Sequence, residues 1–239
     1  MDQVLLTIPE IREVRQLAKN YNPVEFAGYI REVQRKYLEP LIGSALYLDM
    51  LNNTSVLTSG LLTIGDKYKI TDYKSDDDFT NVGASSNETG VVFTATGTTP
   101  TKWASSSSLQ TTSSIYFDLL EGKQYTYGDT LYNFYGAKMY LIYLFLYLYF
   151  KEGDLNYTDS GKKTYNAENS TDARTNLNSS IINNHFNSAK VIGESITEFL
   201  EYNKDLYPLY KSTDTNTDVN YRFDFKVLSN NYRRDKIII

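Results

Sequence analysis

The segment 139–150, MYLIYLFLYLYF, constrains the fold more than any other part of the chain, because it is apolar on every side of a helix. Such a helix is stable only inside a protein core or a membrane. A membrane span needs about 20 apolar residues, and this run is shorter. Polar or small residues interrupt it upstream, at Asn133, Gly136 and Lys138. We therefore predict a central core helix over 130–151, capped by Asp129, and no membrane partner.

Helix-start signals and apolar residues at helical spacing predict further helices around this core. The first begins at a capping box formed by Thr7 and Glu10. Proline cannot continue a helix and glycine allows a turn, so we expect the second helix to break at Pro40 and Gly43. The helices are expected at about 7–19, 22–39, 44–51, 113–122 and 170–202.

The stretch 59–112 has a different character, with Gly, Ser, Thr, Asp and Asn dominating it. Short β-rich runs at 67–71 and 90–95 lie between glycines, which predicts a small inserted β module. A disordered loop is the alternative. The module is favoured because a disordered segment has no need of large apolar residues, and these are present: Tyr68, Ile70, Phe79, Phe93 and Trp103.

A linker-like sequence, STDTNTDVN, opens the last stretch, 212–239. The following YRFDFKV alternates as a half-buried strand does, with one apolar face formed by Tyr221, Phe223, Phe225 and Val227. The chain closes on Ile237, Ile238 and Ile239. We predict that this C-terminal arm docks on another subunit, by strand addition or by filling a pocket. The alternative is that it packs on its own domain.

These segments predict a mainly α fold. A helical domain is expected from 1–58 and 113–211, with the β module at 59–112 inserted in it and the extended arm at 212–239 following it.

Tyrosine is abundant: the chain has 22 Tyr and 11 Phe against 1 Trp and 1 His. Tyrosine suits surfaces that become buried on assembly, although codon usage in an AT-rich genome has the same effect. The net charge of −5 argues against a general nucleic-acid binder. The absence of cysteine excludes disulfides and thiolate sites, and it fits assembly in a reducing cytoplasm.

No pattern in the chain indicates catalysis. His185 is the only histidine, and no second His or Cys completes a zinc site with it. Asp76, Asp77 and Asp78 lack the Gly and Glu of a calcium loop, so a solvated turn is favoured and ion binding stays open. The glycine motifs of nucleotide-binding loops are missing. A pair of glycosidase carboxylates has no sequence signature, and no residue pattern recommends one. We predict no catalytic, metal or cofactor site.

Several segments carry a resemblance to a known family. The residues 37–43, YLEPLIG, followed by Leu46-Tyr47-Leu48, resemble the N-terminal signature of head–tail connector proteins of tailed phages, including the ring proteins of crAss-like phages. The residues 199–203 and 207–210 look like the end of the same domain. Within the insert, 78–84, 90–101 and Trp103 are similar to a small β module of phage virion proteins.

The resemblance implies a structural virion protein that forms a closed ring, commonly of twelve copies, on the portal protein. Its partners would be copies of itself, the portal and other tail or ring proteins, with DNA passing through the channel without specific binding. It would be assembled in the host bacterial cytoplasm and found in the neck or tail of the virion. A second class of function is virion decoration or host-glycan binding through Trp103, Tyr68 and Tyr73, and a third is a cell-wall hydrolase.

Overall fold

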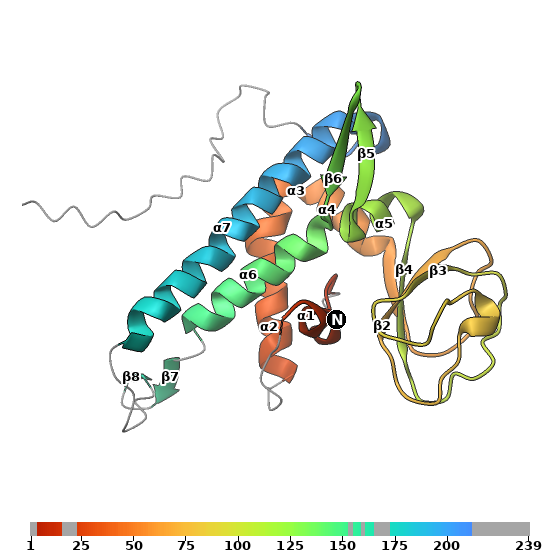
Figure 1. The fold of residues 1–239 in the computed structure, drawn as a ribbon, viewed down its shortest axis with the longest axis horizontal. Coiled ribbons are helices and arrows are strands. Elements are labelled where there is room, and N and C mark those ends of the chain that lie inside the picture. Colours follow the sequence, from red (N-terminus) through yellow and green to blue (C-terminus); the bar gives the residue numbers. More distant parts are fainter. Residues whose placement is uncertain (1–3, 16–22, 153–154, 159–160, 165–172, 212–239) are drawn as a thin grey trace, which may run out of the picture.

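The computed structural model describes residues 4–15, 23–152, 155–158, 161–164 and 173–211 (Figure 1). It contains both helices and antiparallel strands, and strands occur in several parts of the chain, which makes it a mixed α/β fold. The prediction of a mainly α fold is wrong, because strands also form outside the stretch 59–112. The helical elements are α1 (Ile8–Val14), α2 (Pro23–Val33), η1 (Gln34–Leu38), α3 (Glu39–Ile42), α4 (Ser44–Asn52), η2 (Thr80–Val82), α5 (Ser114–Glu121), α6 (Gly136–Glu152), α7 (Ala173–Tyr202) and η3 (Lys204–Leu206).

Within the described residues, every strand pairing is antiparallel. A four-stranded sheet has the order β1-β4-β2-β3, and two hairpins pair β5 with β6 and β7 with β8. The strands are β1 (Thr54–Leu57), β2 (Lys67–Asp72), β3 (Val92–Thr94), β4 (Ser108–Thr112), β5 (Lys123–Tyr127), β6 (Thr130–Phe134), β7 (Leu155–Thr158) and β8 (Gly161–Thr164).

The helix α6 lies at the centre of the main hydrophobic core, as its apolar sequence requires. Leu141, Phe145 and Leu146 are fully buried on it. The long helix α7 runs along α6, and α2 packs against α6 as well (Figure 1). No described helix is both long enough and apolar enough to cross a membrane.

The long core helix begins later than the sequence indicated. It starts at Gly136 instead of Thr130, because 123–134 form the β5–β6 hairpin. Gly128 and Asp129 make its two-residue turn, with Gly128 at a φ of +59°. A glycine with positive φ at the first turn position is typical of a type II′ hairpin turn. Asp129 therefore closes a hairpin and does not cap a helix.

The expected break after the second helix lies at Gly43 alone. The elements α2, η1 and α3 follow one another without a gap from 23 to 42, with Pro40 inside the helical run. The turn before Pro40 is π-helical, and the Glu39 N–H donates to the Gln34 carbonyl. This wider turn accommodates a residue that lacks a backbone N–H. The chain turns at Gly43, whose φ of +85° favours glycine.

The four-stranded sheet encloses a hydrophobic cluster of its own. Tyr68, Ile70 and Phe79 are at its centre, and Trp103 packs at its side. Its first strand, β1, precedes residue 59, and pairs with β4 in a register that joins Thr54 to Thr112. The sheet therefore extends beyond the stretch 59–112 on its N-terminal side.

Candidate functional site

Two acidic and two basic side chains meet where α1, the sheet and the helices come together, although they are far apart in the sequence. The Lys138 Nζ on α6 lies 2.5 Å from Glu10 Oε1 and 2.5 Å from Glu121 Oε1. The Lys69 Nζ on β2 lies 3.0 Å from Glu10 Oε1 and 2.7 Å from Glu121 Oε2. We call these four residues the ion cluster. Its formal charges cancel.

Further polar groups complete the ion cluster. Gln110 on β4 accepts a hydrogen bond from Lys138 and donates one to the Leu5 carbonyl at 3.3 Å. Glu10 also accepts the backbone N–H of Thr7 at 2.9 Å, which confirms the predicted capping box. The side chains of Glu10 and Lys138 are only 2% and 5% exposed. Such deep burial is tolerated because each charge has opposite charges and hydrogen-bond partners.

The ion cluster is a structural junction and not an acid–base pair. Burial opposes ionisation of Glu10, but Lys138 and Lys69 outweigh it and lower its pKa to about 2. Burial likewise opposes the charged form of Lys69, yet Glu10 and Glu121 raise its pKa. A general acid or base needs a pKa near the working pH. Neither Glu10 nor Lys69 meets this condition near neutral pH.

The aspartates 76–78 close a loop of the sheet. Asp77 is buried, and its carboxylate accepts the backbone N–H groups of Ala104 and Ser105 at 2.8 Å and of Ser107 at 2.9 Å. Burial opposes its ionisation, but these donors lower the pKa of Asp77. Of the three aspartates expected in a solvated turn, only Asp76 is exposed.

Asp78 also has internal partners. It accepts the Thr80 N–H at 3.0 Å and the Asn87 side-chain amide at 2.9 Å, and these hydrogen bonds lower its pKa to about 2. Within the described ranges, no group of three or more His, Asp or Glu side chains is placed to hold a metal ion.

His185 lies half-buried on α7 and packs as an aromatic side chain. Its ring stacks on Phe150 with centroids 5.5 Å apart and lies 5.9 Å from the ring of Tyr143. Burial and the nearby Arg15 lower the pKa of His185. Its contacts are those of a packed side chain in the helix pair.

The three aromatic side chains considered for glycan binding have partners inside the sheet region. Tyr68 is buried, and its hydroxyl accepts the Thr63 N–H at 2.9 Å. The Tyr73 hydroxyl donates to the Asp77 carbonyl at 3.1 Å. Trp103 packs edge-on against Phe79 and donates its Nε1–H to the Ser107 carbonyl at 2.8 Å. These contacts give all three side chains a role in packing.

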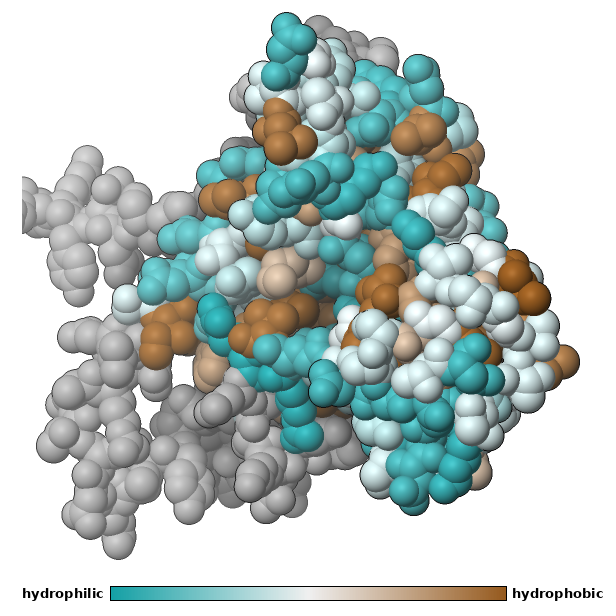
Figure 2. Space-filling model, turned by 45° about the vertical axis from the view of Figure 1, so that its right-hand side comes forward, coloured by the Kyte–Doolittle hydropathy of each residue, from teal (hydrophilic) through white to brown (hydrophobic). Residues whose placement is uncertain are grey.

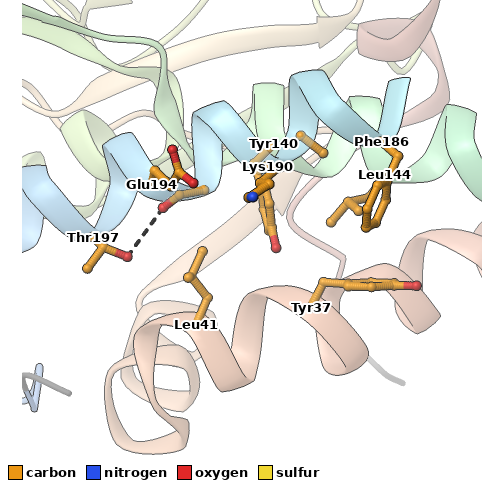
Figure 3. Close-up of a pocket in the computed structure, with 10 residues that line it drawn as sticks. Tyr37, Leu41, Tyr140, Leu144, Phe186, Lys190, Glu194 and Thr197 are labelled. Carbon is orange, nitrogen blue, oxygen red and sulfur yellow. Dashed lines mark hydrogen bonds between the residues drawn. The ribbon is translucent and has the colours of Figure 1, made fainter. Parts of the chain in front are cut away.

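An apolar groove of about 330 Å³ lies between α7, α6 and the helical run η1–α3 (Figure 3). Tyr37 and Leu41 line one side, and Tyr140 and Leu144 lie on α6 (Figure 3). Gly193 on α7 allows close packing against α6, since a Cβ there would lie 3.1 Å from the Tyr140 ring. The remaining lining residues are on α7: Phe186, Ala189, Lys190, Glu194 and Thr197.

A second hollow, of about 560 Å³, lies on the other side of the same helix pair. Asn187 and Val191 on α7 line this hollow. Each lies two positions before a residue that lines the groove, Ala189 and Gly193 respectively. Two residues correspond to about 200° around a helix, so the two hollows use opposite sides of α7. The second hollow is rimmed by exposed apolar side chains: Val191 is 65% exposed and Tyr135 is 57% exposed.

The β5–β6 hairpin adds an aromatic surface at the end of α7. Tyr125 stacks on Tyr132 at 5.2 Å and packs edge-on against Phe199 at 5.1 Å. Tyr127 stacks on Tyr202 at 3.9 Å and is still half exposed. On the face drawn in Figure 2, exposed hydrophobic side chains form small separate groups among polar ones.

The predicted docking residues of the C-terminal arm lie outside the described residues: Tyr221, Phe223, Phe225, Val227, Ile237, Ile238 and Ile239. Of the predicted helix-break residues, Pro40 is exposed and Gly43 half-buried, next to the groove residue Leu41. Sequence reasoning missed the ion cluster entirely. The one signal for it was Lys138, a charged residue at the start of an otherwise apolar helix.

The chain is thus a mixed α/β protein with two hollows along one helix pair and a buried ionic junction. A family of unknown function (DUF6712) matches residues 102–220, which run from the loop before β4 through α7 and beyond. No curated protein and no solved structure matches the chain.

Proposed function

We propose that the protein is a structural subunit of the head–tail connector of a tailed phage and has no enzymatic role. Copies of it form a closed ring on the portal protein, with DNA passing through the channel. The resemblance of 37–43 and 199–210 to connector proteins supports this assignment, and twelve is the copy number that it favours. The role places the protein in the neck or tail of the virion.

The pair of hollows on opposite sides of α7 is the observation that carries the proposal. A ring built head to tail needs two different surfaces on each subunit, one for each neighbour. The groove beside Tyr140 and the hollow beside Val191 are different in shape and lining, and both include apolar side chains. A rigid helix pair holds them at a constant angle, which is what closure of a ring requires.

The ion cluster supports the same role. It joins α1, β2, α5 and α6 through four close charge pairs. Such a junction would hold the elements of a ring subunit in a fixed arrangement. The net charge of −5 is compatible with a channel in which DNA slides, because tight phosphate contacts would hinder passage.

Native mass spectrometry of the chain, with and without the portal protein of the same phage, tests the proposal. We expect a closed ring when the portal is present. The variant Val191→Glu places a charge in the second hollow, and Glu194→Trp fills the groove. Both side chains are exposed, so folding should be retained, as circular dichroism can verify.

Each variant alone should fail to form the ring. Their equimolar mixture should give a dimer and nothing larger, because one intact groove can still meet one intact hollow. Leu61→Glu, which is 70% exposed on a loop of the sheet, is the matched control and should leave the ring intact. Absence of the protein from purified virions, or rings formed by both variants, would refute the proposal.

A further inference from the structure

The outer edge of β5 has room for another strand, and we infer that residues 221–227 of a neighbouring copy add to it. The inference rests on the proposed function, because it names how one subunit of the ring holds the next. It assigns one occupant, the YRFDFKV segment of the C-terminal arm, to one surface of the described fold.

The hairpin offers an edge for pairing. It has only two strands, with Lys123 facing Phe134 at its base and Tyr127 facing Thr130 at its turn. In a hairpin with a two-residue turn, the pair that flanks the turn is hydrogen-bonded, and such pairs then alternate along the ladder. The backbone groups of Gln124 and Thr126 therefore point away from β6. No backbone partner outside the hairpin is found for them among the described residues.

The edge of β5 is the more open of the two. The backbone of α7 lies closer to β6 than to β5, and Figure 1 shows the hairpin extending past the helices. Gln124 and Thr126 are exposed. A two-stranded hairpin is marginally stable by itself, so a third strand would stabilise it.

The side chains of the hairpin match the pattern of the arm. Successive residues of a strand face opposite sides. On β5, Tyr125 and Tyr127 face α7, whereas Gln124 and Thr126 face outward. The arm has the same arrangement, with aromatic or apolar residues at 221, 223, 225 and 227 and polar ones at 222, 224 and 226. An added strand would extend the aromatic face with its own aromatic side chains and leave its charges in solvent.

The chain length permits the contact between subunits. The last described residue is Lys211, and Tyr221 lies ten positions further along the chain. Ten residues reach up to about 33 Å when extended. Tyr202 stacks on Tyr127, so the C-terminal end of α7 lies beside the hairpin of its own subunit. We expect this reach to cover the distance to the hairpin of the next subunit.

Cysteine cross-linking tests the inference, and the chain suits it because it has no cysteine. The full chain with Thr126→Cys is mixed with a full chain of different mass with one cysteine in the arm. Arm positions 222 to 226 are tested one at a time, in the presence of the portal protein, under mild oxidation. We expect disulfides between the two chains for at least one of positions 222, 224 and 226 and loss of the signal at 223 and 225.

This alternation is the signature of a strand paired at the edge. Asn133→Cys, on the opposite edge of the hairpin, and Leu61→Cys, far from it, are the matched controls and should not react. Replacing Phe223 and Phe225 together by serine should abolish the cross-link, whereas serine at Arg222 and Lys226 should retain it.

Other results would overturn the inference. A doubly substituted chain that links only within itself would show that the arm stays on its own subunit. Disulfides formed by Asn133→Cys would show that the arm binds at the edge of β6. Equal reaction at all arm positions would show that the arm does not pair as a strand. If rings form without the predicted link, the inference fails and the proposed function stands. If neither forms, both fail.

Discussion

The four-stranded sheet and the β5–β6 hairpin are both antiparallel, but they are held in place by different forces. The sheet encloses its own cluster around Tyr68, Ile70 and Phe79. The hairpin has no cluster of its own and depends on α7, through the contacts of Tyr125 and Phe134 with Phe199. The sheet is therefore a small folded body, whereas the hairpin is an extension of the helix pair.

The attachments of the two regions to the helices differ as well. The ion cluster joins the sheet to α1, α5 and α6, and its energy depends on complete charge pairing. Stacked aromatic side chains and two close glycines join the hairpin to α5, α6 and α7. A Cβ on Gly122 would lie 2.3 Å from the Phe134 carbonyl oxygen, and one on Gly136 would lie 2.4 Å from the Leu120 carbonyl oxygen. The comparison leads to two expectations. Substituting charged residues or changing the pH should weaken the attachment of the sheet. Changes in side-chain size or backbone conformation should weaken the attachment of the hairpin.

The largest effect is expected from Lys138→Met, which removes the most buried cation of the ion cluster. Glu10 and Glu121 would then share only Lys69, and one buried charge would be left uncompensated. Breaking a buried ion pair in this way costs about 3–5 kcal/mol of unfolding free energy. Chemical denaturation measures it. Lys36→Met, which removes an exposed pair with Glu32, is the matched control and should have little effect. Similar losses of unfolding free energy in both variants would contradict the structural role of the ion cluster.

Gly122→Ala should damage the base of the hairpin. Gly122 has φ of +87° and ψ of 165°, a region that is essentially restricted to glycine. Backbone strain of about 1–3 kcal/mol and overpacking against Phe134 of about 1–3 kcal/mol together predict a loss of at least about 2 kcal/mol.

Gly128→Ala, at the hairpin turn, is the comparison for Gly122→Ala. Gly128 also has positive φ, but a Cβ there meets nothing within 4 Å. We expect a loss of about 1–2 kcal/mol, from backbone strain alone. Equal losses at the two positions, measured by thermal unfolding, would show that the close approach at the base is unimportant.

Acid should weaken the sheet attachment before it affects the hairpin. The pKa of Glu10 is about 2 in the folded protein against 4.5 for the free side chain. A lowered carboxyl pKa contributes stability that is present above pH 4.5 and is lost as the pH falls toward 2. The shift corresponds to about 3 kcal/mol. Glu10→Gln should therefore be less stable at pH 7 but lose less stability between pH 5 and pH 3. If the unfolding free energy of Glu10→Gln fell as steeply between pH 5 and pH 3 as that of the unsubstituted protein, this role of Glu10 would be wrong.

The smallest effect is expected from Tyr125→Leu, which keeps an apolar side chain on the hairpin but loses the aromatic contacts with Tyr132 and Phe199. Aromatic pairs contribute about 0.5–1.5 kcal/mol beyond their buried area, so we expect a loss of about 1 kcal/mol. Gln124→Leu, on the outward face of β5, is the control and should leave the unfolding free energy nearly unchanged. A loss as large as that of Lys138→Met would mean that the hairpin is part of the core.

Local sequence patterns predicted the elements whose signals are complete within a few residues. The capping box of Thr7 and Glu10, the apolar core helix and the runs that became β2 and β3 belong to this group. The hairpin was missed because Asp129 is equally suited to a helix cap and to a turn. Pro40 was misjudged because the π-helical turn before it has no sequence signal. The mainly α fold class was wrong because strands outside 59–112, the β5–β6 hairpin among them, were not predicted.

The candidate interaction surfaces were harder to predict from the sequence. Apolar spacing indicated that α6 and α7 are packed, but not that two hollows remain between them and their neighbours. The division into a helical domain at 1–58 and 113–211, a module at 59–112 and an arm at 212–239 stays a prediction, as does the docking of the arm.

The sequence alone determined that most of 139–150 must be buried, that glycines occupy the tight turns and that no cysteine chemistry is available. These properties depend on residue type and on neighbours a few positions away. Only the tertiary structure decided that Glu10, Lys69, Glu121 and Lys138 meet in one buried cluster. Their pairing depends on how α1, the sheet and the helices pack, because no local pattern links side chains up to 128 positions apart.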